Sequence, residues 1–143
     1  MSDLQRFIDA QNYNYQSALE EIKNGRKTSC WMWYVFPQIC GLGYSQMAKR
    51  YEIHDLQEAK DYLCNNVLRN RLEEICQTAL EVVSDDPYLV FGSPDDMKLK
   101  SSMTLFEAAE PENKLFGRVL EKYFHGERDQ RTLEILASQE KSI

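Results

Sequence analysis

The sequence lacks several features that would assign it to a broad class of proteins. None of its apolar runs approaches the roughly 20 residues of a membrane-spanning helix, and the segment 1–6 has neither the basic nor the apolar region of a signal peptide. We therefore expect a cytoplasmic protein with no membrane partner. Acidic residues outnumber basic ones by 23 to 17, which gives a net charge of −6. Binders of duplex nucleic acid normally carry a basic domain or stripe, so we do not expect that partner.

Residues that hold metals and cofactors are also scarce. The four cysteines form no C-x-x-C pair, and the only histidines are His54 and His125. In a cytosolic chain such cysteines are most simply free thiols, so we predict no metal site. The segment Gly41-Leu42-Gly43 precedes an expected helix, as in a phosphate-binding loop, but Gln46 stands where the third glycine of G-x-G-x-x-G belongs. We therefore favour a plain turn and predict no cofactor.

The sequence does have helical periodicity along almost its whole length, with apolar residues at i, i+3, i+4 and i+7. The expected helix starts are Ser2 with Gln5, Asp55 with Glu58, Asn66, Ser93 before Pro94, and Asp129. The only candidate strands are the runs 34–36 and 88–91. We predict an all-α fold, a single compact domain of about seven or eight short helices over residues 1–137, followed by a C-terminal tail at 138–143.

The first unusual segment, 27–38, reads KTSCWMWYVFPQ. Its simplest interpretation is a buried run packed against the helices, and this suits Met32, Val35 and Phe36. It suits Trp31 and Trp33 less well, because a buried indole needs a partner for its N–H group. Aromatic faces also stack against flat ligands and bases, so a ligand-binding role is the second interpretation.

The second unusual segment, 93–104, reads SPDDMKLKSSMT. A capping serine, a proline and two acids in the first turn predict a helix start, with Asp96 and Lys100 as an i,i+4 ion pair. Ser101 and Ser102 then fall in the middle of the helix, where serine is a poor helix former. Polar residues on an otherwise apolar helix indicate either a buried polar network or the wall of a pocket, and the sequence favours neither.

Basic residues accompany both segments, so their convergence would form a positive, aromatic-lined pocket on an acidic protein. We therefore predict a site for a small anionic, phosphate-bearing or nucleotide-like ligand. The predicted ligand-binding residues are Lys27, Ser29, Trp31, Trp33, Gln38, Arg50, Lys98, Ser101 and Ser102. Asp95 and Asp96 are the candidate catalytic carboxylates if the protein also processes its ligand. A helix-capping position favours an ionised carboxylate, which opposes acid–base catalysis and favours plain binding.

The alternative function is a protein–protein interaction module. In this hypothesis the segment 31–38 is exposed and anchors a partner, because Trp and Tyr are favoured at interface hot spots. Burial distinguishes the two hypotheses. A concavity that combines the tryptophans with Lys27, Asp95 and Ser101 favours a ligand, whereas a flat exposed aromatic patch favours a partner.

These segments also carry a family resemblance. Its signatures are DLxRF at 3–7, AQ at 10–11, GRKxS at 25–29, WMW at 31–33, FPQ at 36–38, GLGxS at 41–45, FGSPDDxK at 91–98 and SSMTLF at 101–106. Over about residues 3–136 the chain closely resembles the bacterial and fungal family catalogued as domain of unknown function 1810, sometimes mislabelled calpastatin. The resemblance implies a mainly α-helical single domain and no established reaction. Family members commonly carry histidine where this chain has Cys30, which favours a packing role over catalysis at that position.

Overall fold

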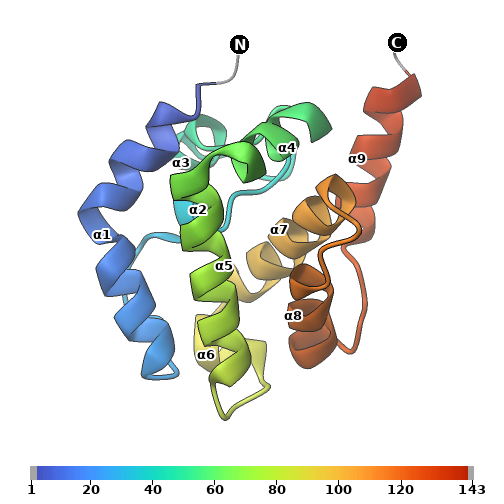
Figure 1. The fold of residues 1–143 in the computed structure, drawn as a ribbon. Coiled ribbons are helices and arrows are strands. Elements are labelled where there is room, and N and C mark those ends of the chain that lie inside the picture. The colour runs from blue at the N-terminus through green and yellow to red at the C-terminus, as the bar shows by residue number, and fades with distance from the viewer. Residues whose placement is uncertain (1–2, 142–143) are drawn as a thin grey trace.

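The computed structural model describes residues 3–141, and within them the chain forms nine α-helices and no β-strand (Figure 1). The helices are α1 (Gln5–Lys23), α2 (Met32–Val35), α3 (Gln46–Arg50), α4 (Leu56–Cys64), α5 (Asn66–Glu81), α6 (Pro87–Phe91), α7 (Asp95–Ala109), α8 (Leu115–Phe124) and α9 (Gln130–Lys141). This confirms the predicted all-α fold. The runs 34–36 and 88–91 are not strands but fall mainly in the short helices α2 and α6.

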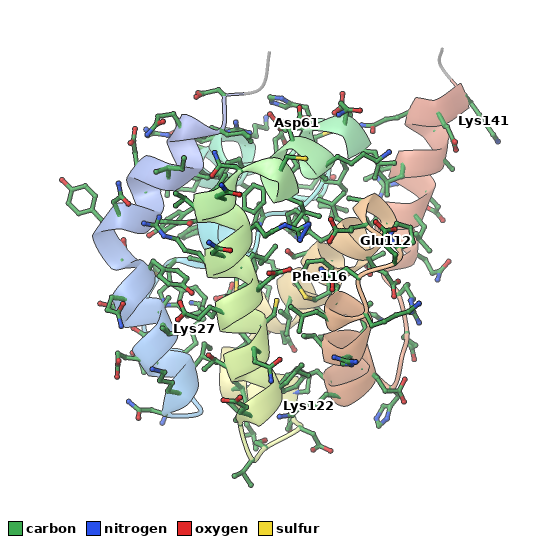
Figure 2. All side chains as sticks on the ribbon, viewed as in Figure 1. Lys27, Asp61, Glu112, Phe116, Lys122 and Lys141 are labelled. Carbon is green, nitrogen blue, oxygen red and sulfur yellow. The ribbon has the colours of Figure 1, made fainter. Side chains whose placement is uncertain are left out.

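Helix α5 stands between α1 and α8, and α7 packs against α4, α6, α8 and α9 (Figure 1). The helices enclose one apolar core. Within it, Tyr62 of α4 contacts Phe7 of α1 with ring centroids 5.3 Å apart, and Phe106 of α7 at 5.1 Å. Phe116 of α8, labelled in Figure 2, continues the series at 5.9 Å from Phe106. Each such ring pair adds about 0.5–1.5 kcal/mol beyond the burial of its apolar area, so the rings tie four helices together.

No helix within residues 3–141 is both long and apolar enough to cross a membrane. The cytoplasmic location stays a prediction.

Two of the expected helix caps form as predicted. The Asp55 carboxylate accepts a hydrogen bond from the Glu58 N–H at 2.8 Å and begins α4. The Asp129 carboxylate accepts from the Thr132 N–H at 3.0 Å and begins α9. Both caps satisfy N–H groups of a first helical turn that would otherwise have no partner.

Two other expected helix starts, at Asn66 and Ser93, differ from the prediction. Asn65 rather than Asn66 caps α5, since its side chain accepts from the N–H groups of residues 67 and 68. Ser93 does not cap α7: this helix begins at Asp95 after a cis Ser93–Pro94 peptide bond, and no side chain caps it. Ser2 lies outside the described residues.

The C-terminal segment also differs from the prediction. We expected a tail from residue 138, whereas α9 continues to Lys141. The Gln139 side chain donates a hydrogen bond to the His54 carbonyl at 2.8 Å, which ties the end of α9 to the segment before α4. Gln139 therefore packs with the rest of the domain, while residues 138, 140 and 141 are exposed.

The polar residues in the middle of α7 are buried. The Thr104 hydroxyl donates to the Lys100 carbonyl at 2.8 Å and accepts from the Asp129 N–H at 2.9 Å, so it connects α7 to the start of α9. The Ser101 hydroxyl donates to the Met97 carbonyl at 3.1 Å. The Ser102 hydroxyl is fully buried and has no hydrogen-bond partner among the described residues. Of the two interpretations that the sequence leaves open, Thr104 fits a buried polar network, because it joins α7 to the start of α9.

This contrast predicts opposite effects of two small substitutions. Thr104→Val keeps the side-chain shape but leaves the Asp129 N–H without its partner, so we expect a loss of about 1–3 kcal/mol in the free energy of unfolding. Ser102→Ala removes a buried hydroxyl that makes no hydrogen bond, so we expect no loss or a gain. Urea denaturation of both variants checks this. A Ser102→Ala protein less stable than Thr104→Val would contradict the assignment.

Candidate functional site

Glu21 of α1 holds the segment 27–38, which we call the aromatic segment, although it precedes Trp31 by ten residues. Its Oε1 accepts hydrogen bonds from the Thr28 N–H at 2.8 Å, the Ser29 N–H at 3.1 Å and the Trp31 indole N–H at 2.9 Å. Its Oε2 accepts from the Ser29 hydroxyl at 2.5 Å. Partial burial alone would raise the pKa of Glu21, but these bonds stabilise the carboxylate and lower its pKa to about 2.

The two unusual segments meet at Asp95. Lys27 approaches its Oδ2 to 2.7 Å and Lys98 approaches its Oδ1 to 3.6 Å. Each ammonium also lies over an indole: Lys27 is 4.9 Å from the Trp31 ring centroid and Lys98 is 5.0 Å from that of Trp33. We call Lys27, Asp95 and Lys98 the charge triad. It holds two cations and one anion, which leaves a formal charge of +1.

A groove of about 440 Å³ opens beside the triad, between α7 and the segment that runs into α3. We call it the α3–α7 groove. Its lining residues are Gln38, Leu42, Gly43, Tyr44, Ser45, Ala48, Pro94, Met97, Lys98, Ser101 and Asp129. A small hollow of about 10 Å³, enough for about one water molecule, adjoins it. Trp33, Tyr51 and Glu52 line that hollow together with Gln38, Gly43 and Ala48. The groove volume lies within the range of small-molecule sites.

The close approach of α3 to this groove depends on Gly43. A Cβ atom at residue 43 would lie 2.5 Å from the Ala48 Cβ, closer than side-chain carbons approach in proteins. Glycine at 43 therefore lets the loop pack directly on α3. The sequence predicts only a plain turn at this glycine and gives no sign of its packing role.

Asp129 gives the groove a second charged group. Its N–H is bound to Thr104, and its Oδ2 accepts from both the N–H and the hydroxyl of Thr132. Its Oδ1 takes part in no hydrogen bond within residues 3–141. From the sequence, Asp129 is predicted only as a helix cap, because capping fully explains an aspartate at that place. Its position in the groove depends on the packing of α9 against α7.

The predicted ligand-binding residues fall into two groups. Gln38, Lys98 and Ser101 line the α3–α7 groove, and Trp33 lines the adjoining hollow. The other five do not line it. Trp31 and Ser102 are fully buried, so neither can contact a ligand. The remaining three are Lys27, Ser29 and Arg50.

Lys27 and Ser29 are held by other groups of the protein, and Arg50 lies elsewhere. Lys27 is held by Asp95 and by the Ser29 carbonyl at 2.5 Å. The Ser29 hydroxyl is bound to Glu21. Arg50 lines a separate hollow with residues of α1, including Arg6 and Tyr13. Of the three basic residues that the sequence places in a positive pocket, only Lys98 lines the α3–α7 groove.

Both candidate catalytic carboxylates are engaged by other groups of the protein. Asp95 is bound by two lysines. Asp96 accepts a hydrogen bond from the Met97 N–H at 2.8 Å. Its expected ion pair with Lys100 is absent, because Lys100 pairs with Glu127 at 3.0 Å.

Cys30 lies outside the groove, and its side chain is exposed. A larger hollow of about 740 Å³ lies between α4 and α9, with Leu56, Leu133 and Leu136 among its lining residues. It contains none of the residues that the sequence singled out as ligand-binding.

Comparisons with known proteins place the chain in a family. Residues 1–136 match the family described as "Protein of unknown function (DUF1810)", so the chain belongs to that family. It is similar to the conserved hypothetical protein Rv1873 from Mycobacterium tuberculosis, which is known from a crystal structure. The two share 47% sequence identity with a TM-score of 0.92, over 94% of this chain and 96% of the other. No curated protein matches the chain.

The Glu21 network predicts a pH-dependent loss of stability. Glu21→Gln removes the charge from four hydrogen bonds, so we expect about 1–3 kcal/mol less unfolding free energy at pH 7. Because the pKa of Glu21 is lowered in the folded protein, its contribution is full above pH 4.5 and is lost as the pH falls toward 2. Urea denaturation at several pH values measures this.

A matched control comes from the neighbouring residue. Glu20 is exposed, so Glu20→Gln should change stability little at any pH. A Glu21→Gln deficit that stays constant from pH 7 to pH 2.5 would show that the charge of Glu21 is not its source.

The contact between Gly43 and Ala48 predicts a non-additive pair of substitutions. Gly43→Ala should lower the unfolding free energy by about 1–3 kcal/mol, because the new methyl group collides with α3. Adding Ala48→Gly removes the opposing methyl group and should recover part of the loss. Denaturation of both single variants and the double variant gives the coupling energy. Strictly additive effects would contradict the close approach.

Proposed function

We propose that this protein binds a small phosphate-bearing or nucleotide-like ligand in the α3–α7 groove, with Lys98 as the partner of the anionic group. The observation that carries the proposal is the position of Lys98. It lines the groove and at the same time belongs to a triad with a formal charge of +1. An anion in the groove would therefore meet a cation whose own counter-ion is already shared with another lysine.

The two lysines of the triad differ in their freedom to engage a ligand. The Lys27 side chain is 8% exposed and lies 2.7 Å from Asp95, whereas that of Lys98 is 22% exposed and lies 3.6 Å away. The distance for Lys98 exceeds that of a charge-assisted hydrogen bond. Lys98 can therefore turn to a ligand while Lys27 continues to neutralise Asp95, which avoids leaving a half-buried carboxylate without a partner.

Apolar side chains supply the remaining contacts that a nucleotide-like ligand needs. Tyr44 and Met97 are exposed beside the groove, and Leu42 is half-buried within it. Aromatic faces accept flat rings, and methionine adapts its shape to different ligands. Exposed apolar groups gathered around a concave, partly polar site are typical of ligand binding.

Binding is better supported than catalysis. Asp95 and Asp96, the candidate catalytic carboxylates, are occupied by lysines and by a backbone N–H group. The interaction-module alternative is weakened by burial of its anchor. Of residues 31–38, only Trp33 and Gln38 are more than slightly exposed, so the segment presents no flat aromatic patch.

Lys98→Met tests the proposal, because methionine keeps much of the aliphatic chain over Trp33 and removes the charge. We expect inorganic phosphate or adenosine 5′-monophosphate to raise the melting temperature of the wild type, and the variant to bind at least about tenfold more weakly. A ligand at 100 times its Kd stabilises the folded state by about 2.7 kcal/mol. Thermal shift followed by titration calorimetry measures both.

Lys23→Met at the exposed end of α1 is the matched control, since it removes the same charge away from the groove. It should bind like the wild type. If nucleotides, sugar phosphates and inorganic phosphate at millimolar concentration all leave the wild type unstabilised, the proposal is wrong. Equal losses in the two lysine variants would show that Lys98 has no specific role.

A further inference from the structure

We infer that the ligand of the α3–α7 groove is a ribose phosphate, with its sugar hydroxyls bound by Asp129 and its phosphate by Lys98. This inference rests on the proposed function and names the class of ligand and a second binding residue. It starts from Asp129, which lines the groove and which the phosphate-binding proposal leaves without a role.

Asp129 is held in a fixed position. The Thr104 hydroxyl accepts its N–H at 2.9 Å, and Thr132 donates to its Oδ2 through the N–H at 3.0 Å and the hydroxyl at 2.5 Å. These three bonds leave Oδ1 as the carboxylate oxygen with no hydrogen bond inside residues 3–141. Binding groups whose rotamers are fixed by neighbouring bonds lose little freedom when a ligand arrives.

An ionised carboxylate accepts hydrogen bonds and donates none. It repels a second phosphate and selects a ligand with hydrogen-bond donors at that place. Vicinal sugar hydroxyls are such donors, and an acidic side chain on ribose hydroxyls is a recurring solution in dinucleotide-binding folds. Ser101, which lines the groove between Lys98 and Asp129, adds a hydroxyl that can accept a further bond.

The places of Lys98 and Asp129 along α7 suit a ligand with separate anionic and hydroxyl-bearing parts. Lys98, Ser101 and Thr104 follow each other at three-residue intervals on α7, and Asp129 is hydrogen-bonded to Thr104. The rise of an α-helix places residue 104 about 9 Å along the axis from residue 98. Inorganic phosphate is too small to touch both ends, whereas a sugar phosphate can span them.

The groove also has room for a base. Its volume of about 440 Å³ exceeds what a single phosphate needs, and Tyr44 and Met97 stand exposed at its edge. A phosphorylated amine would also satisfy Asp129, but it would leave these apolar side chains without a partner. The ribonucleotide uses all three kinds of contact that the groove offers.

Calorimetry with adenosine 5′-monophosphate and its 2′,3′-dideoxy analogue tests the inference, because the two differ only in the sugar hydroxyls. We expect the wild type to prefer the ribonucleotide by at least about tenfold. Asp129→Asn should abolish most of this preference without weakening the binding of the dideoxy compound, since asparagine still caps a helix and no longer repels the phosphate. Asp55→Asn is the control, because Asp55 also caps a helix but lies outside the groove.

The outcomes separate this inference from the proposed function. Equal affinities of the wild type for the two nucleotides, with binding that still depends on Lys98, would refute the role of Asp129 and leave phosphate binding intact. Tighter binding of phosphoethanolamine than of adenosine monophosphate would refute the ribose assignment. If none of these compounds binds the wild type, both proposals are wrong. The comparison of the two nucleotides with the wild type tests the ribose assignment even if Asp129→Asn fails to fold.

Discussion

The carboxylate of Glu21 holds the turn on which the site depends. By accepting hydrogen bonds from Thr28, Ser29 and Trp31, it ties the residues after α1 back onto that helix. A carboxylate that accepts several N–H and O–H groups favours one backbone path strongly, because losing that path would leave all of these donors without a partner. The indole of Trp31 is thereby fixed in place and fully buried.

The charge triad builds on that surface. Lys27 lies over Trp31, and its backbone N–H donates to the Val90 carbonyl at 2.7 Å while its ammonium reaches Asp95. One residue therefore attaches the aromatic segment to both α6 and α7. Lys98 completes the arrangement from one turn further along α7. The position of the groove cation is thus determined by contacts that begin at α1, far from it in sequence.

The sequence predicts the long helices well, because each has an amphipathic period that extends over several turns. It cannot predict α2 and α3, which are only four and five residues long and show no full period. It indicates that the indole N–H of Trp31 needs a hydrogen-bond partner. That partner, Glu21, lies on another element and can be identified only in the tertiary structure. Ser102 is misassigned for a related reason: its neighbour Ser101 faces the groove, and a single-residue step along a helix turns the side chain by about 100°.

Charged residues were predicted less reliably than apolar ones. The apolar period of a helix shows which of its faces is buried, and many residues contribute to that one signal. Each ion pair, in contrast, depends on which elements meet in the folded protein. Asp96 lies at the right helical spacing to pair with Lys100, but Lys100 pairs instead with Glu127, which follows α8. Such exposed pairs contribute little, about 0–1 kcal/mol, so small differences in packing decide between them. Asp129 was assigned correctly as a cap, but its second oxygen could not be placed.

The overall charge of the protein bears on how such a groove would select its ligand. A net charge of −6 repels anions at long range, so the field of the whole protein does not steer a phosphate toward Lys98. At physiological ionic strength this repulsion is screened within about 8 Å. In the proposed function, recognition must then come from contacts inside the groove, which Lys98 and Asp129 both line. Such a groove would bind simple anions weakly. It would distinguish phosphate-bearing ligands by the other groups that they carry.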